Sequence, residues 1–286
     1  MQQIVGKTET ARATVDAAAI HVFETGRLTA NRTFLRGEGF RSFLRPVEEI
    51  DFPVLAYVIE HPEGLIAIDT GLGAHVTRPR TFRGFPPIPT KASPALEIGA
   101  QMRERGLDPS EVRRVILTHL DWDHTGGLHH FPAAEVLVHS PEYEFAQTRM
   151  GRVRFRPSLW PERFAPDVYE LEADPFGPFP VSRPATNAGD LRIIPIPGHA
   201  PGQVAVAYDI GDVTLLFAAD HMLRADWFVD DLRAERLIMM GAFGKEDARL
   251  TSQRLRQFIR QRPVVLLPAH DSAAPGRLAM REVTRS

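Results

Sequence analysis

Four apolar segments of this chain each run directly into a histidine or an aspartate. They are short enough to be buried strands, and they read RVILT before His119, LRIIPIPG before His199, VTLLFAA before Asp220 and PVVLLPA before His270. One polar residue after a strand is an ordinary loop feature. Four such residues in one chain indicate a site at the edge of a sheet, to which several strands each contribute a side chain.

The segment after the first of these strands is rich in groups that bind metals. Residues 118–127 (THLDWDHTGG) place four candidate ligands within six positions, and these are His119, Asp121, Asp123 and His124. Imidazole and carboxylate groups suit zinc, iron or manganese. The chain has no cysteine, which excludes a thiolate site, a disulfide and a cysteine nucleophile. We expect Gly126 and Gly127 to let the backbone turn sharply below the metals.

The remaining pattern predicts strands that precede helices in both halves of the chain. Residues 54–59 and 65–69 predict a β-hairpin, residues 135–139 a strand before a helix, residues 203–209 and 213–219 two further strands, and residues 246–262 a helix. The expected fold class is α/β, with two packed β-sheets flanked by helices. We expect one domain over residues 1–286, with an N-terminal extension over residues 1–50 and an excursion between the halves over residues 151–190.

Charge and hydropathy limit the partners. The net charge is −2, so no overall field attracts the chain to nucleic acid or to an anionic membrane. No segment approaches the roughly 20 apolar residues that cross a bilayer, and the N-terminus lacks the pattern of a secretory signal. We therefore expect a cytoplasmic protein with a small-molecule substrate. Whether it forms a homodimer stays open.

The motifs resemble those of the metallo-β-lactamase superfamily. Residues 119–124 are similar to its HxHxDH signature, and its other motifs are matched in order by DTG at residues 69–71, PGHAPG at 197–202, AAD at 218–220 and PAHD at 268–271. The resemblance covers residues 50–275 and implies the αββα sandwich of that family. The segment VLAYVIEHPEGLIAIDTG and the HTGG and PGHAPGQ blocks are most similar to the N-acyl-homoserine lactonase group.

The resemblance also implies a site with two divalent metal ions, zinc in the first instance. His119, Asp121 and His199 would bind the first ion, Asp123, His124 and His270 the second, and Asp220 both. A hydroxide that bridges the ions would attack the carbonyl carbon of a lactone or ester. Asp123 and Asp220 would be the catalytic carboxylates, with Asp123 handling protons. Asp69 would hold a ligand or loop in place.

Asp121 departs from the family pattern, which usually has histidine there. An anionic ligand hardens the first site and favours iron or manganese more than an all-histidine site does. The diiron flavoproteins of the superfamily have a glutamate at this position. Iron and manganese therefore stay open beside zinc, and so does an iron-dependent redox function, although no cysteine is present to carry electrons.

Three further hydrolytic functions would use the same ligands on different substrates. They are those of a thioesterase similar to glyoxalase II, a β-lactamase and a phosphodiesterase.

Outside the ligand set, we expect His129 and His130 to lie at the surface or at the edge of the core. The basic stretch 149–156 is expected to be a solvated face or an oligomer contact. The loop with Arg78, Arg80 and Arg83 could cover a site or form an interface.

Overall fold

The structure is a computed structural model, and it describes residues 20–31, 49–77, 89–230 and 243–284. The loop around Arg78, Arg80 and Arg83 lies outside the described residues, as does most of the segment 1–50. Within the described residues, no helix combines the length and the apolar character that crossing a membrane requires.

A seven-stranded sheet forms the first half of the fold. Its strand order is β4-β1-β2-β3-β5-β6-β7. The pairs are antiparallel from β4 to β3 and parallel from β3 to β7. The strands are β1 (Ile20–Asn31), β2 (Glu49–His61), β3 (Gly64–Ile68), β4 (Thr90–Lys91), β5 (Val112–Ile116), β6 (Glu135–His139) and β7 (Asp167–Tyr169).

A five-stranded sheet forms the second half, in the order β12-β11-β10-β9-β8. All of its pairs are antiparallel except β11 with β12, which is parallel. Both sheets are therefore mixed. The strands are β8 (Arg183–Pro184), β9 (Leu191–Pro195), β10 (Val204–Ile210), β11 (Val213–Ala219) and β12 (Val264–Pro268).

The two sheets pack face to face over a shared apolar core. Alternate residues of a strand point to opposite faces, and β2 shows this clearly: Leu55 and Tyr57 join the core between the sheets, whereas Ala56 and Val58 join the outer cluster. On β10, Val206 belongs to the inner core. The strand residues of both sheets thus bury one face against the other.

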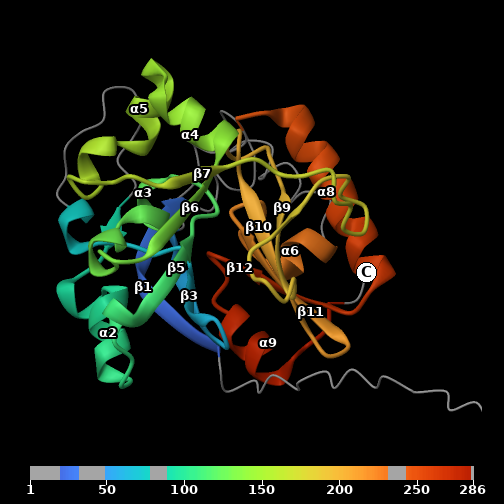
Figure 1. Cartoon of the computed structure of the whole chain (residues 1–286), viewed down its shortest axis with the longest axis horizontal. Coiled ribbons are helices and arrows are strands. Elements are labelled where there is room, and N and C mark those ends of the chain that lie inside the picture. The colour runs from blue at the N-terminus through green and yellow to red at the C-terminus, as the bar shows by residue number, and fades with distance from the viewer. Residues whose placement is uncertain (1–19, 32–48, 78–88, 231–242, 285–286) are drawn as a thin grey trace, which may run out of the picture.

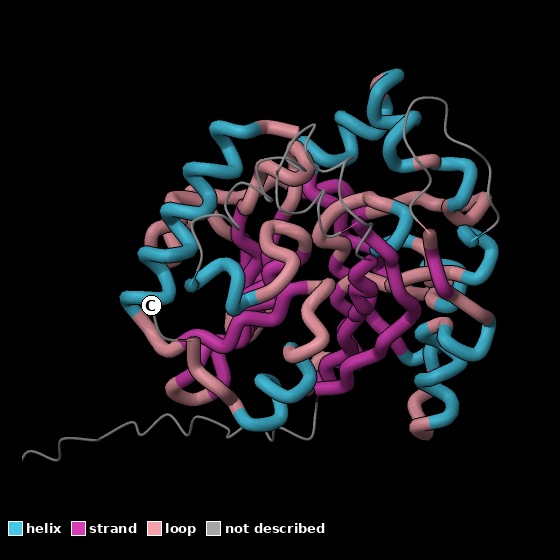
Figure 2. The backbone as a smooth tube through the Cα atoms, turned by 180° about the vertical axis from the view of Figure 1, so that it is seen from behind, coloured by secondary structure: helices cyan, strands magenta, loops and turns pink. Residues whose placement is uncertain are grey.

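Helices cover the two outer faces, as Figures 1 and 2 show. Apolar residues of α2 (Ile98–Glu104), α4 (Ser140–Gln147) and α5 (Arg149–Phe155) pack on the first sheet. Those of α6 (Ala225–Asp230) and α8 (Lys245–Gln261) pack on the second. The helix α9 (Ala274–Met280) contributes Ala274 and Leu278 to the core between the sheets. The expected arrangement of two packed sheets flanked by helices is confirmed.

Short helical turns complete the described elements. The turn α3 (Trp122–Thr125) lies within the segment rich in candidate ligands. The 3₁₀ turns are η3 (Ala74–Thr77), η4 (Pro94–Leu96), η5 (Pro109–Glu111), η6 (Leu128–His130) and η7 (Pro157–Leu159).

Two segments at the margins of the expected halves contribute strands to the sheets. Residues 20–31 do not extend away from the fold, because β1 pairs with β2 along its length and buries Phe23 completely. The segment 151–190 is more than an excursion, because β7 is an edge strand of the first sheet and β8 an edge strand of the second. This segment therefore carries the chain from one sheet to the other.

Candidate metal centre

The candidate ligands lie where the ends of several strands meet. Residues 117–119 follow β5, and the three later candidates follow β9, β11 and β12. Two main-chain hydrogen bonds join the halves here: the Val204 N–H donates to the Thr118 carbonyl at 2.9 Å, and the Leu55 N–H donates to the Ala269 carbonyl at 2.9 Å. The sheets are therefore fixed to each other beside the site.

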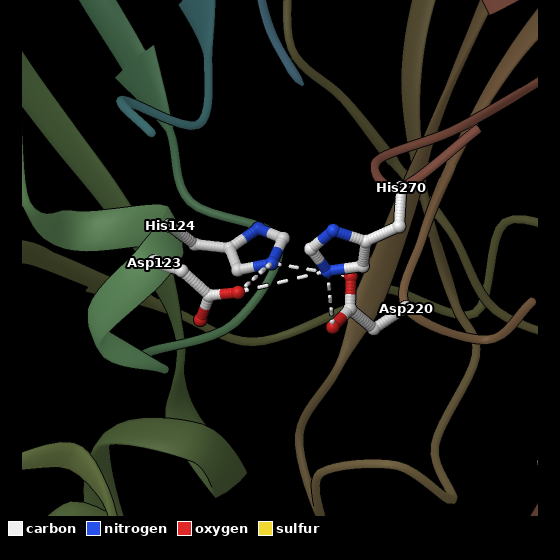
Figure 3. Close-up of side chains that lie close together, drawn as sticks. All are labelled: Asp123, His124, Asp220 and His270. Carbon is white, nitrogen blue, oxygen red and sulfur yellow. Dashed lines mark hydrogen bonds and ion pairs between the residues drawn. The ribbon is translucent and has the colours of Figure 1, made fainter. Parts of the chain in front are cut away.

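One group of side chains spans the two halves, as Figure 3 shows. It consists of Asp123, His124, Asp220 and His270, each with a ligand-type atom within 4.8 Å of the others. His124 Nε2 lies 3.1 Å from Asp220 Oδ1, and His270 Nε2 lies 3.1 Å from Asp220 Oδ2. His270 Nε2 is also 3.6 Å from Asp123 Oδ2. We refer to these four residues as the second group.

A first group adjoins it and shares Asp220. It consists of His119, His199 and Asp220, again within 4.8 Å of one another. Asp220 Oδ2 lies 3.6 Å from His199 Nε2 and 3.9 Å from His119 Nε2. Asp220 is thus common to both groups.

Asp121 lies beside the first group. Its Oδ2 is 3.0 Å from His199 Nε2 and 3.3 Å from His119 Nε2. The Arg154 guanidinium donates to both of its oxygens, from Nε to Oδ1 at 2.8 Å and from a terminal nitrogen to Oδ2 at 2.6 Å. The structure thus brings together all seven residues proposed from the sequence and adds an arginine to them.

Arg154 departs from the expectation that the basic stretch 149–156 is a solvated face or an oligomer contact, although Arg149, Arg152 and Val153 are exposed as expected of a solvated face. On α5, Gly151 and Phe155 are buried, and Arg154 lies on the same side of the helix and reaches the site. The spacing of Gly151, Arg154 and Phe155 is the i, i+3, i+4 pattern of a buried helix face. That pattern is the one signal in the sequence that could have identified this residue.

Hydrogen bonds outside the groups orient the imidazoles. Asp69, as the resemblance implied, holds the loop: it accepts from the Thr118 N–H, the Thr118 hydroxyl and His124 Nδ1, each at 2.8 Å. His270 Nδ1 donates to the Pro53 carbonyl at 2.9 Å. An imidazole that donates from Nδ1 presents the lone pair of Nε2 to a metal, so His124 and His270 are prepared to bind one.

Glu142 on α4 joins the two loops of the site, and no local pattern in the sequence indicates it. The buried carboxylate accepts from the Leu120 N–H at 3.1 Å and from the Gly202 N–H at 2.8 Å. Burial raises the pKa of Glu142 to about 7, although both N–H donors act to lower it. The residue thereby fixes the loop that carries Asp121 against the loop that carries His199.

The charge and hydrogen bonding of the site fit divalent cations. Among the described residues, His119 Nε2, His124 Nε2 and Asp220 Oδ1 are buried atoms without a hydrogen-bond partner. Burial raises the pKa of Asp220, but without a bound ion the positive charges of His270 and His124 outweigh it and hold that pKa well below its usual value. A buried carboxylate cluster of this kind needs positive charge, which metal ions supply.

The remaining candidate residues have structural contacts. His139 is buried with Nδ1 2.8 Å from the Gly202 carbonyl. His221 is fully buried and pairs with Ser252. His129 and His130 both approach the same oxygen of Glu97, at 3.2 and 2.7 Å.

The sequence also matches known proteins. A sequence model of the metallo-beta-lactamase superfamily matches residues 50–270. A probable metallo-hydrolase of Mycobacterium tuberculosis is 31% identical over 182 residues, which are 57% of this chain and 54% of that protein. This chain thus spans about half the length of that relative. An N-acyl homoserine lactonase of Bacillus cereus is 24% identical over 248 residues, covering 85% of this chain and 90% of the lactonase.

A solved structure has the same fold. It is an N-acyl homoserine lactone hydrolase with its product N-hexanoyl-L-homoserine bound at the catalytic metal centre. The TM-score is 0.72 at 20% sequence identity, and the match covers 90% of this chain and 94% of that one.

Proposed function

This chain belongs to the metallo-β-lactamase superfamily, and we propose that it is a metal-dependent hydrolase that opens a lactone ring, with N-acyl-homoserine lactones as its substrates. The observation that carries the proposal is the position of Asp220 between two groups of histidine and aspartate side chains. The N-acyl homoserine lactonases among its relatives support the choice of substrate.

We assign the seven residues to two divalent ions. His119, Asp121 and His199 would bind the first, Asp123, His124 and His270 would bind the second, and Asp220 would bind both. Zinc is the proposed metal, because imidazole and carboxylate ligands suit it. Bound ions of this kind lower the pKa of water to about 7 and withdraw electrons from a carbonyl group.

The protein residues position the ions and move one proton. In the reaction, a water oxygen bonds to the lactone carbonyl carbon, the ring C–O bond breaks, and the alkoxide that leaves takes up a proton. Asp123 would carry this proton from the attacking water to the alkoxide, because its carboxylate lies within the second group, with Oδ2 3.6 Å from His270 Nε2. Asp69 and the Pro53 carbonyl hold His124 and His270 in place during these changes.

A substrate panel tests the proposal. The purified full chain, loaded with zinc, is offered N-acyl-homoserine lactones, a thioester, a β-lactam and a phosphodiester, and products are identified by mass spectrometry. We expect ring opening to be the fastest reaction. Hydrolysis of another class with the lactones untouched would contradict the proposal.

One variant and a matched control sharpen the test. Asp123→Asn is expected to lower kcat/KM for the lactone by about 10²–10⁴-fold, the usual effect of losing an acid–base group. Asp51→Asn serves as the control, because Asp51 binds the exposed Lys91 on β4 and takes no part in the site. An Asp123→Asn chain as active as the control would exclude the role assigned to Asp123.

A further inference from the structure

We propose that Arg154 is a positioning residue for the first ion: it holds Asp121 as a ligand and supplies the charge that makes an aspartate suitable there. The inference rests on the two-ion centre proposed above. It concerns the relation between two side chains that come from different parts of the fold, the loop after β5 and the helix α5.

The contact between the two side chains is a bidentate hydrogen-bonded ion pair, which we call the fork. Two nitrogens of the guanidinium donate to the two oxygens of Asp121, at 2.8 and 2.6 Å. A bidentate pair fixes both the position and the rotation of a carboxylate, which a single hydrogen bond does not. Asp121 Oδ2 is thereby held 3.0 Å from His199 Nε2 and 3.3 Å from His119 Nε2.

Arg154 also holds the second loop of the first group. Its remaining terminal nitrogen donates to the His199 carbonyl at 2.7 Å. Among the described residues, its hydrogen bonds go to Asp121 and His199, and none goes to Asp123, His124 or His270. The influence of Arg154 is therefore concentrated on the first group.

The helix α5 is fixed in place on both sides of this arginine. Thr148 caps its first turn, since the Thr148 hydroxyl oxygen accepts from the Gly151 N–H. Phe155 next to Arg154 is fully buried in the outer core of the first sheet. The side chains of Arg154 and Asp121 are only 20% and 13% exposed, so water screens their attraction little.

The pair changes the charge of the first group. An aspartate alone adds one negative charge to a buried site, whereas aspartate with arginine adds none and so resembles a neutral imidazole in charge. Removing one partner of a buried ion pair leaves the other without compensation. Asp121 and Arg154 are therefore expected to act as one unit. Replacing either one alone should weaken zinc binding at the first group, unless a second change restores the net charge of the pair.

The experiment measures zinc bound to the full-length protein rather than activity. Wild type, Arg154→Met, Asp121→His and the double variant D121H/R154M are compared by elemental analysis after dialysis and by calorimetric zinc titration. Arg152→Met is the matched control, because Arg152 on the same helix is exposed and binds Gln147. Arg154→Lys keeps the charge without the fork and is used if Arg154→Met does not fold.

The inference predicts a specific pattern. Wild type and Arg152→Met bind two zinc ions. Each single variant at Asp121 or Arg154 binds the ion at the first group about 10–100-fold more weakly, as is usual when a partner of a metal ligand is lost. The double variant, which combines a neutral imidazole with no arginine, recovers binding of the ion at the first group. Arg154→Lys falls between wild type and Arg154→Met.

Three results would overturn it. The first is an Arg154→Met or Arg154→Lys protein that binds both ions as tightly as wild type does. The second is such a variant that binds zinc more tightly, which would show that the arginine competes with the metal for Asp121. The third is a double variant that binds zinc no more tightly than the single variants do. A wild-type chain that binds fewer than two ions would instead refute the proposed two-ion centre, so the two failures are distinguishable.

Discussion

At the scale of single residues, Asp69 links the backbone to the second group. The carboxylate accepts three hydrogen bonds, two from Thr118 and one from His124. Its φ of 56° lies in the left-handed region, which aspartate adopts more readily than most residues other than glycine. The hydrogen bonds to Thr118 and His124 fix where its side chain points.

Asp69→Asn is expected to weaken zinc binding at the second group by about 10–100-fold. An amide has only one oxygen, so the variant cannot accept from all three donors at once. Calorimetric zinc titration checks the expectation, with Asp51→Asn as the control, because Asp51 pairs with Lys91 and is not part of the site. Unchanged affinity in Asp69→Asn would mean that His124 needs no such partner.

His139 makes the stability of the fold sensitive to acid. Burial lowers the pKa of His139 in the folded state, whereas the unfolded chain has the ordinary value of about 6.5. The folded protein therefore binds the proton less readily, and stability is lost as the pH falls below about 6.5. His139→Asn keeps a donor for the Gly202 carbonyl but does not titrate.

Urea unfolding of both proteins between pH 8 and pH 5 tests this. The stability of wild type should fall more steeply with acid than that of His139→Asn. Parallel pH profiles would show that His139 has the same affinity for protons in the folded and unfolded chains.

The seven candidate ligands could be predicted from the sequence because each follows an apolar strand or stands in the short segment after one. Arg154 and Glu142 could not. They stand on α5 and α4 among other charged residues, and only the packing of these helices brings them to the loops. A local pattern identifies residues at strand ends, whereas these two contacts depend on tertiary structure.

At the scale of elements, the loop after α3 passes very close to the segment after β3. A Cβ on Gly126 would lie 2.3 Å from the Gly73 nitrogen, and one on Gly127 would lie 2.3 Å from the Thr70 oxygen. Their φ values of −63° and −93° are ordinary for any residue. Glycine is therefore not required here for the expected sharp turn. It is required because the two backbones approach each other so closely.

Gly126→Ala should destabilise the protein by about 1–3 kcal/mol or more, because the backbone must move to admit the methyl group. Gly276→Ala is the matched control. Its Cβ would meet no atom within 4 Å, and in α9 the change should stabilise the protein by about 0.4–1 kcal/mol. Urea denaturation measures both, and equal effects of the two substitutions would contradict this explanation.

Strands with long apolar runs could be predicted, and the short or interrupted ones could not. The hairpin predicted over residues 54–59 and 65–69 is confirmed as β2 and β3. In β1 the residues His21, Glu24 and Arg27 interrupt the apolar pattern, and the strand is defined by its pairing with β2. The edge strands β7 and β8 have three and two residues, too few to show a period.

At the scale of the whole molecule, the site joins the two halves of the fold. Asp123 and His124 come from the half with the seven-stranded sheet, and Asp220 and His270 from the half with the five-stranded sheet (Figure 3). An ion held by all four binds only when both sheets are in place. Metal binding is therefore expected to stabilise the folded chain, because the unfolded chain has no such site.

The most direct test of the central claim follows zinc content and lactone opening together. The protein is stripped with a chelator, zinc is returned in steps, and ions per chain and the rate of ring opening are measured at each step. The account predicts that ring opening disappears with the ions and returns as the content rises to two per chain. Ring opening that continues in protein free of metal would contradict it.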